Sequence, residues 1–67
     1  MKKHSDTQNL IERIDRLVRM QATGIGEEFA AKLSISRDTL FRLLRYLRAK
    51  GAPIKYCRYR RTYYYYE

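Results

Sequence analysis

Two short helical patterns lie only about three residues apart in the middle of this chain, and this arrangement constrains its fold more than any other feature. The second pattern is a leucine stripe with the spacing i, i+3, i+4, i+7, formed by Leu40, Leu43, Leu44 and Leu47. That spacing places the four side chains on one face of a helix. Ser36 is a candidate N-cap, while Gly51 and Pro53 oppose continuation, so we expect this helix over residues 36–50.

The first pattern is shorter and covers residues 26–33. Glu27 and Glu28 place carboxylates in its first turn, where the positive end of the helix dipole stabilises them. Ser34 then ends the helix after about two turns. A short helix joined through a tight turn to a longer and more basic helix is the arrangement of a helix-turn-helix motif.

A further helix is expected ahead of these two, over about residues 8–21. Its apolar stripe is formed by Leu10, Ile11, Ile14, Leu17 and Val18. Its charges nearly balance, with Glu12–Arg16 and Asp15–Arg19 spaced for i,i+4 ion pairs. We therefore interpret this helix as structural. Residues 1–7 are polar and are expected to form a flexible N-terminus, with Thr7 as a cap and His4 solvated rather than binding a metal.

The chain after Pro53 is rich in β-branched and aromatic residues, which favour strands. We expect strands over 54–58 and 62–66, a loose turn at 59–62 and, as an option, a third short strand from 22–25. Successive strand side chains point to opposite faces, and we expect Tyr64 and Tyr66 to cover the helices. The predicted fold class is α+β, mainly α: a winged helix-turn-helix domain over 8–67, with three helices followed by a two-stranded β-hairpin wing at about 53–66.

Charge is distributed unevenly along the chain. The net charge is +8, but residues 1–36 hold six Lys or Arg against five Asp or Glu, whereas residues 37–67 hold nine against two. Such a basic half attracts a polyanion. No apolar run approaches the roughly 20 residues of a membrane span. Cys57 is the only cysteine, which suits a reducing cytoplasm and a free thiol in a strand.

The chemistry-bearing patterns of enzymes are missing from the sequence. It contains no glycine-rich phosphate loop, no metal-spaced His/Cys cluster and no recognisable activated nucleophile. A domain of 67 residues also has a small core in which an enzyme cleft is hard to house. We therefore expect a binding protein that is not an enzyme and needs no cofactor.

The segment FAAKLSISRDTLFRLLRYLRAKGAPIKY, residues 29–56, resembles the DNA-binding domain of bacterial winged-helix regulators of the DeoR, biotin-repressor and WYL type. The matching pieces are Phe29-Ala30 with Leu33, the run from Ser36 to Arg42, Leu44 with Leu47, and the run from Gly51 to Ile54. The resemblance implies a third helix that enters the major groove of DNA. Those regulators carry a ligand-sensing domain after the wing, whereas this sequence stops at Glu67, so no small-molecule ligand is expected.

The DNA-facing positions of that family fall on the start of the third helix: Ser36, Arg37, Asp38, Thr39 and Arg42. Arginine can bond guanine through two hydrogen bonds, and Ser or Thr can reach phosphates. Asp38 is interpreted first as an acid that stabilises the helix end and pairs with Arg42. Arg45 is expected on phosphates or on a solvated face, as is Arg48. The wing turn adds Arg58, Arg60 and Arg61, which we expect to bind phosphates or the minor groove.

Three readings of the basic second half stay open. The expected function is sequence-specific binding of double-stranded DNA by a cytoplasmic, nucleoid-associated transcriptional regulator. The main alternative is a winged-helix module that binds another protein, because fold alone does not fix function. The tyrosines of the wing could instead stack on single-stranded nucleic acid, or their outward edge could join two copies in a homodimer.

Overall fold

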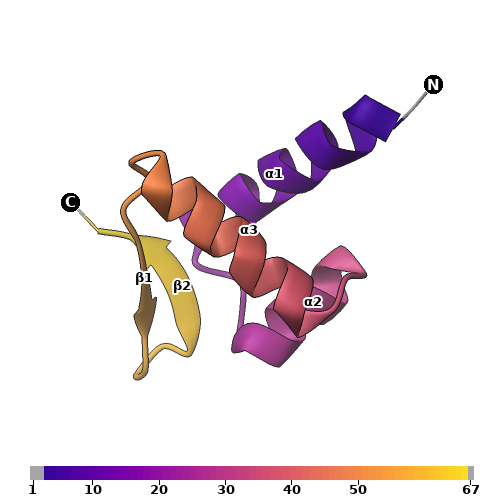
Figure 1. Cartoon of the computed structure of the whole chain (residues 1–67). Helices are drawn as coiled ribbons and strands as arrows, with labels where there is room; N and C mark the ends of the chain where they lie inside the picture. Colours follow the sequence, from indigo (N-terminus) through magenta and orange to yellow (C-terminus); the bar gives the residue numbers. More distant parts are fainter. Residues whose placement is uncertain (1–2, 67) are drawn as a thin grey trace.

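The computed structural model of the protein describes the backbone from residue 3 to residue 66 and the side chains from residue 8 to residue 66. The helices are α1 (Lys3–Met20), α2 (Gly26–Leu33) and α3 (Arg37–Ala49), and the strands are β1 (Ile54–Cys57) and β2 (Thr62–Tyr65). Three helices therefore precede one antiparallel hairpin (Figure 1). This layout confirms the predicted mainly helical α+β class and is that of a winged helix.

Helix α1 begins at Lys3, ahead of the residue 8 that the apolar stripe predicts, and Thr7 lies within it instead of capping it. The stripe marks only the part of the helix that is buried, because Ile14 and Val18 are its fully covered residues. The sequence of residues 3–7 is polar, so it gave no apolar pattern from which this part of the helix could be predicted. Over residues 3–66 no helix combines the length and apolarity needed to cross a membrane.

The turn between α2 and α3 has the three residues that the sequence predicts. Ser34 adopts the left-handed conformation (φ 60°, ψ 40°), and its N–H bonds the carbonyl of Ala31 at 3.0 Å. The N–H of Ile35 reaches back to Ala30 at 3.0 Å, so the last carbonyls of α2 are satisfied. Ser36 then caps α3, as predicted, by accepting a hydrogen bond from the N–H of Thr39 at 3.1 Å.

One core joins all five elements. Its buried members are Ile14, Val18, Phe29, Ala30, Leu33, Leu40, Leu44, Ile54 and Tyr63. The ring of Tyr63 lies 5.4 Å from that of Phe29 and 4.9 Å from that of Tyr56, measured between centroids. The contact with Phe29 holds the hairpin on α2, and the contact with Tyr56 joins the two strands.

The hairpin pairs Ile54 with Tyr65 and Cys57 with Thr62, which leaves residues 58–61 as its turn. The turn thus begins one residue earlier than predicted. The tyrosines alternate as expected, but the predicted face is wrong: Tyr63 is buried and Tyr65 packs on the core, whereas Tyr66 is 55% exposed. The register explains the inversion, because Tyr65 lies across from Ile54, which is itself buried.

The optional third strand at 22–25 is not formed in the described chain. Thr23 replaces it with side-chain bonds, since its hydroxyl accepts from the N–H of Tyr63 at 2.8 Å. The N–H of Thr23 in turn donates to the hydroxyl of Thr62 at 3.2 Å. Both threonines are buried, so the loop before α2 is fastened to β2 without a strand ladder.

Candidate nucleic-acid interface

The face of α3 that points away from the core is basic. Asp38, Arg42 and Arg45 recur at i, i+4, i+7 and are exposed, whereas Leu40 and Leu44 are buried on the opposite face. Neither Arg42 nor Arg45 forms an ion pair within residues 8–66. Two cations one turn apart therefore face solvent without a compensating carboxylate, which leaves them available to an anion.

The first turn of α3 holds two hydroxyls whose hydrogen bonds are already arranged. The Ser36 hydroxyl accepts from the N–H of Thr39 and donates to the Thr39 hydroxyl at 3.0 Å. In that arrangement the hydrogen of the Thr39 hydroxyl remains available for an outside acceptor, such as a phosphate oxygen. Both side chains are exposed, so the predicted positions stay reachable.

Arg37 differs from the other arginines of α3 because it is paired. Its guanidinium donates to the Glu27 carboxylate, at the start of α2, over 3.3 Å. Both side chains are more than half exposed, so the pair contributes at most about 1 kcal/mol. The pair holds the Arg37 side chain toward α2, and little free energy is needed to break it.

Two ion pairs expected along single helices are not formed among the described residues. Asp38 does not pair with Arg42, and Glu12 does not pair with Arg16, whereas the predicted Asp15–Arg19 pair is present at 2.9 Å. An exposed i,i+4 pair contributes only about 0.3–0.5 kcal/mol, so its loss is inexpensive. Arg42 consequently lacks the partner that the sequence assigned to it.

The hairpin turn brings the three predicted wing arginines to one end of the hairpin. Arg58, Arg60 and Arg61 are all exposed. Arg60 donates to the side-chain oxygen of Gln21, just after α1, at 2.8 Å. Arg61 takes the left-handed conformation (φ 54°), which a non-glycine residue adopts uncommonly. Arg58 and Arg61 are thus the freer cations of the turn.

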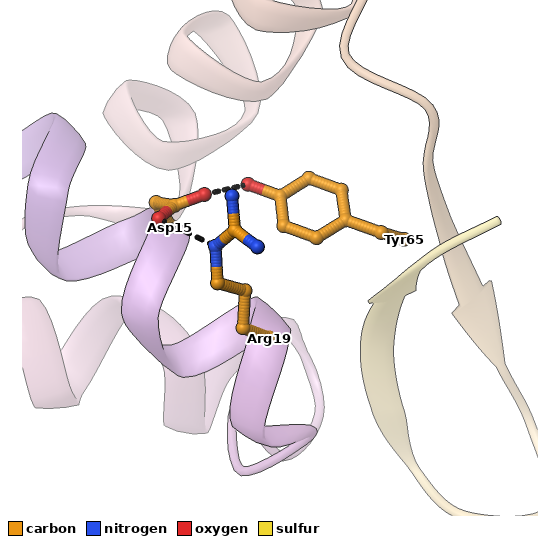
Figure 2. Close-up of polar contacts among 3 residues, drawn as sticks. All are labelled: Asp15, Arg19 and Tyr65. Carbon is orange, nitrogen blue, oxygen red and sulfur yellow. Dashed lines mark hydrogen bonds and ion pairs between the residues drawn. The ribbon is translucent and has the colours of Figure 1, made fainter. Parts of the chain in front are cut away.

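A polar contact between α1 and β2 fixes where the wing stands. The Tyr65 hydroxyl donates to the Asp15 carboxylate at 2.5 Å, and Arg19 donates to the other oxygen of that carboxylate at 2.9 Å (Figure 2). The bond from Tyr65, with a smaller contribution from Arg19, holds the pKa of Asp15 below its ordinary value although burial opposes this. Burial and the neighbouring carboxylate raise the pKa of Tyr65 to about 12.

Arg48 serves the fold. Its Nε donates to the main-chain carbonyl of Ile54 at 2.9 Å, which links the last turn of α3 to the first residue of β1. The sequence offered it as a phosphate contact or a solvated residue, and nothing in its helical spacing indicated this bond. The bond forms because the chain turns at Gly51 and brings Ile54 back beside the last turn of α3.

Several exposed aromatic residues were not among the predicted site residues, and Phe41 and Tyr59 are two that lie directly beside arginines of this interface. Phe41 is 43% exposed on α3 beside Arg42, and Tyr59 is 98% exposed in the hairpin turn. Both follow or precede charged residues in the sequence, and that pattern could have indicated Tyr59. For Phe41 the same pattern was not enough, because a phenylalanine next to a leucine stripe is usually a core residue.

No three His, Cys, Asp or Glu side chains within residues 8–66 gather closely enough to hold a metal ion. His4 lies outside the described side chains. Cys57 is half-buried in β1 and lines an open hollow together with Gln21, Arg60 and Tyr64, where the end of α1 meets the wing.

Comparisons with protein-family models, with curated proteins and with solved structures gave no match to this chain. The class that the fold defines is therefore the winged-helix layout described above.

Proposed function

We propose that this protein is a small transcriptional regulator that binds double-stranded DNA sequence-specifically. Helix α3 lies in the major groove, and the wing contacts the backbone or the minor groove. The observation that carries the proposal is the pair of unpartnered arginines, Arg42 and Arg45, on the exposed face of the second helix of a helix-turn-helix.

The dimensions of α3 support a groove contact. A helix with its side chains is about 10–12 Å wide, and the major groove of B-DNA is about 12 Å wide. The first turn offers Arg37 and Thr39 to base edges or phosphates, and the next turns offer Arg42 and Arg45. A helix whose outer face presents donors and cations in this order suits both base reading and backbone binding.

The wing supports a second contact. Figure 1 shows the hairpin turn at the lower left of the view and the start of α3 at the lower right, next to α2. The last turn of α3 is joined to the start of the hairpin, because Arg48 donates to the carbonyl of Ile54 at 2.9 Å. Arg58 and Arg61 are free of ion pairs within residues 8–66. The Thr23–Thr62 and Asp15–Tyr65 bonds hold β2, the strand that follows the turn. A firmly attached basic turn on the same small domain as a basic helix suits a polyanion long enough to contact both.

The test is fluorescence anisotropy of a labelled random-sequence duplex of about 20 base pairs, roughly two helical turns, over a series of salt concentrations. We expect binding that weakens steeply with salt, because each neutralised phosphate releases counterions. Selection from a randomised duplex pool then yields a preferred site. No binding at low salt would contradict the proposal and favour the protein-interaction module.

A homodimer formed through the wing stays a prediction, and it can be tested with the same purified protein. Tyr56 is 37% exposed and Tyr66 is 55% exposed, so part of the tyrosine edge is open. Sedimentation of the free protein and of its DNA complex gives the number of copies in each. Two copies on a palindromic site would agree with the symmetry expected of a dimeric regulator.

A further inference from the structure

The wing turn presents one aromatic ring that the fold does not use. Tyr59 is 98% exposed, compared with 37% for Tyr56, 49% for Tyr46 and 55% for Tyr66. The other two exposed rings of the wing have partners, since Tyr56 packs against Tyr63 and Lys55 lies over Tyr66. Tyr59 makes no aromatic or cation–π contact within residues 8–66. Its ring therefore contributes nothing visible to stability.

The backbone beneath this ring is held on both sides. On one side the turn joins β1, which pairs in register with β2. On the other side Thr62 is buried and bonded to Thr23, and Arg60 is bonded to Gln21. The ring is thus presented at a defined place by an anchored turn. It does not hang from a long loose loop.

The surroundings of the ring select a partner with two properties. Arg58 and Arg60 are its neighbours in the chain and Arg61 follows, so three exposed arginines share the turn with the ring. The guanidinium groups attract anions, while the exposed ring suits a flat apolar group that can stack on it. A nucleic acid supplies both within a few ångströms, as phosphates and as the base between them.

We propose that Tyr59 is a base-stacking wedge: it enters the minor groove of the bound duplex and stacks on a base at a partly opened step. Arg58 and Arg61 bind phosphates on either side of it. This inference rests on the proposed duplex binding and adds to it a residue that reads DNA deformability. Pyrimidine–purine steps open most easily, so a step of this kind is expected where the wing contacts the selected site.

The test compares Tyr59→Ala and Tyr59→Phe with the wild type on the selected duplex. Because tyrosine carries no charge, Tyr59→Ala should weaken binding about tenfold while the slope of log K against log salt stays unchanged. Tyr59→Phe keeps the ring and should bind like the wild type. Tyr66→Ala is the matched control, since it removes an exposed ring outside the turn.

A fluorescent base reports the stacking itself. With 2-aminopurine placed at the wing-side step, its fluorescence should change when the wild type or Tyr59→Phe binds and remain unchanged with Tyr59→Ala. If Tyr59→Ala binds with wild-type affinity and gives the wild-type fluorescence change, the wedge is wrong although duplex binding stands. If the wild type binds single strands more tightly than duplexes and only that binding depends on Tyr59, a stacking platform replaces the wedge. If the wild type binds no duplex at all, the proposed function fails together with the inference.

Discussion

Helices α1 and α3 are both amphipathic and both carry arginines on their outer faces, yet those arginines have different partners. On α1, Arg13 donates to the main-chain carbonyl of Lys32 at 2.8 Å and Arg19 is paired with Asp15. On α3, Arg42 and Arg45 have no ion-pair partner among the described residues. Arg13 and Arg19 thus close contacts on α1, whereas Arg42 and Arg45 remain available on α3. The division is not complete, because Arg16 on α1 has no ion-pair partner within residues 8–66, and Arg37 and Arg48 on α3 are engaged.

The difference comes from what each helix has within reach. The carboxylate of Asp15 lies one turn before Arg19, and the end of α2 brings a carbonyl to Arg13. The outer face of α3 has only Asp38 as an acid, and that side chain pairs with neither Arg42 nor Arg45. The number of arginines does not distinguish the outer faces of α1 and α3. What distinguishes them is which arginines already have a hydrogen-bond or ion-pair partner.

The difference between α1 and α3 is tested most directly by two double variants, each of which removes two arginines from one helix. Arg42→Ala with Arg45→Ala should weaken binding to duplex DNA roughly 10- to 100-fold and lower the salt slope by about two units. Arg13→Ala with Arg16→Ala lowers the net charge equally and should change both quantities little. Salt-dependent anisotropy measures all three proteins. Equal losses from the two double variants would mean that net charge, and not the α3 face, determines binding.

Arg37 is the intermediate case, an α3 arginine that does have a partner. Arg37→Ala should lose about 1–3 kcal/mol on the selected site and little on a random duplex, because a base contact exists only on the correct sequence. Competition anisotropy with both duplexes gives the two values. Similar losses on both duplexes would assign Arg37 to a phosphate.

We expect the charged residues of α1 to affect the free energy of unfolding, whereas those of α3 affect the affinity for DNA. Tyr65→Phe removes the hydroxyl that donates to Asp15 and should cost about 1 kcal/mol, a low value for a bond to a charged group because the site is partly open to solvent. Urea unfolding followed by circular dichroism measures it. Tyr66→Phe, which alters an exposed ring next to it, should leave the free energy of unfolding unchanged.

The same variant should flatten the pH dependence of stability at both ends. Tyr65 has a pKa raised to about 12, so its contribution is complete below the unfolded phenol value of about 10 and is lost as the pH rises through 12. Asp15 has a lowered pKa, so its contribution is present above about pH 4 and is lost as the pH falls through the lowered value. A wild-type protein whose stability responded to pH like Tyr65→Phe in both windows would contradict this role.

The smallest expected effect comes from converting Arg37 into an unpaired arginine like Arg42. Glu27→Gln removes the carboxylate that holds it and should raise affinity for DNA by a few-fold at most, as an exposed pair contributes about 0.2–1 kcal/mol. The gain should vanish in an Arg37→Ala background, which a double-mutant cycle measures. A gain that persisted there would show that Glu27 acts through general repulsion of DNA.

Periodicity and end signals were enough to predict the helices of this domain and the order of its elements. The leucine stripe, Ser36 and Gly51 gave α3 almost to the residue, and Gly51 indeed has a positive φ of 106°. Such signals are local, so they survive in the sequence alone. The start of α1 was not predicted, because residues 3–7 are polar and show no apolar periodicity.

Contacts between distant segments could not be predicted in the same way. Tyr63 and Tyr65 were assigned to the wrong face because the register of β2 depends on its pairing with Ile54, which no local pattern in a run of four tyrosines specifies. The Thr23–Thr62 and Arg48–Ile54 bonds join residues far apart or across a turn. For the site, the sequence identified the exposed arginines but not which of them are already engaged.

The measurement that tests the central claim most directly is a titration of unlabelled duplex DNA into ¹⁵N-labelled protein, followed by amide chemical shifts. The account predicts that shifts concentrate in the first turns of α3, around Arg37 to Arg45, and in the hairpin turn at 58–61. The outer face of α1, marked by Glu12 and Arg16, should stay unperturbed. Shifts that concentrate on α1, or no shifts at low salt, would contradict the account.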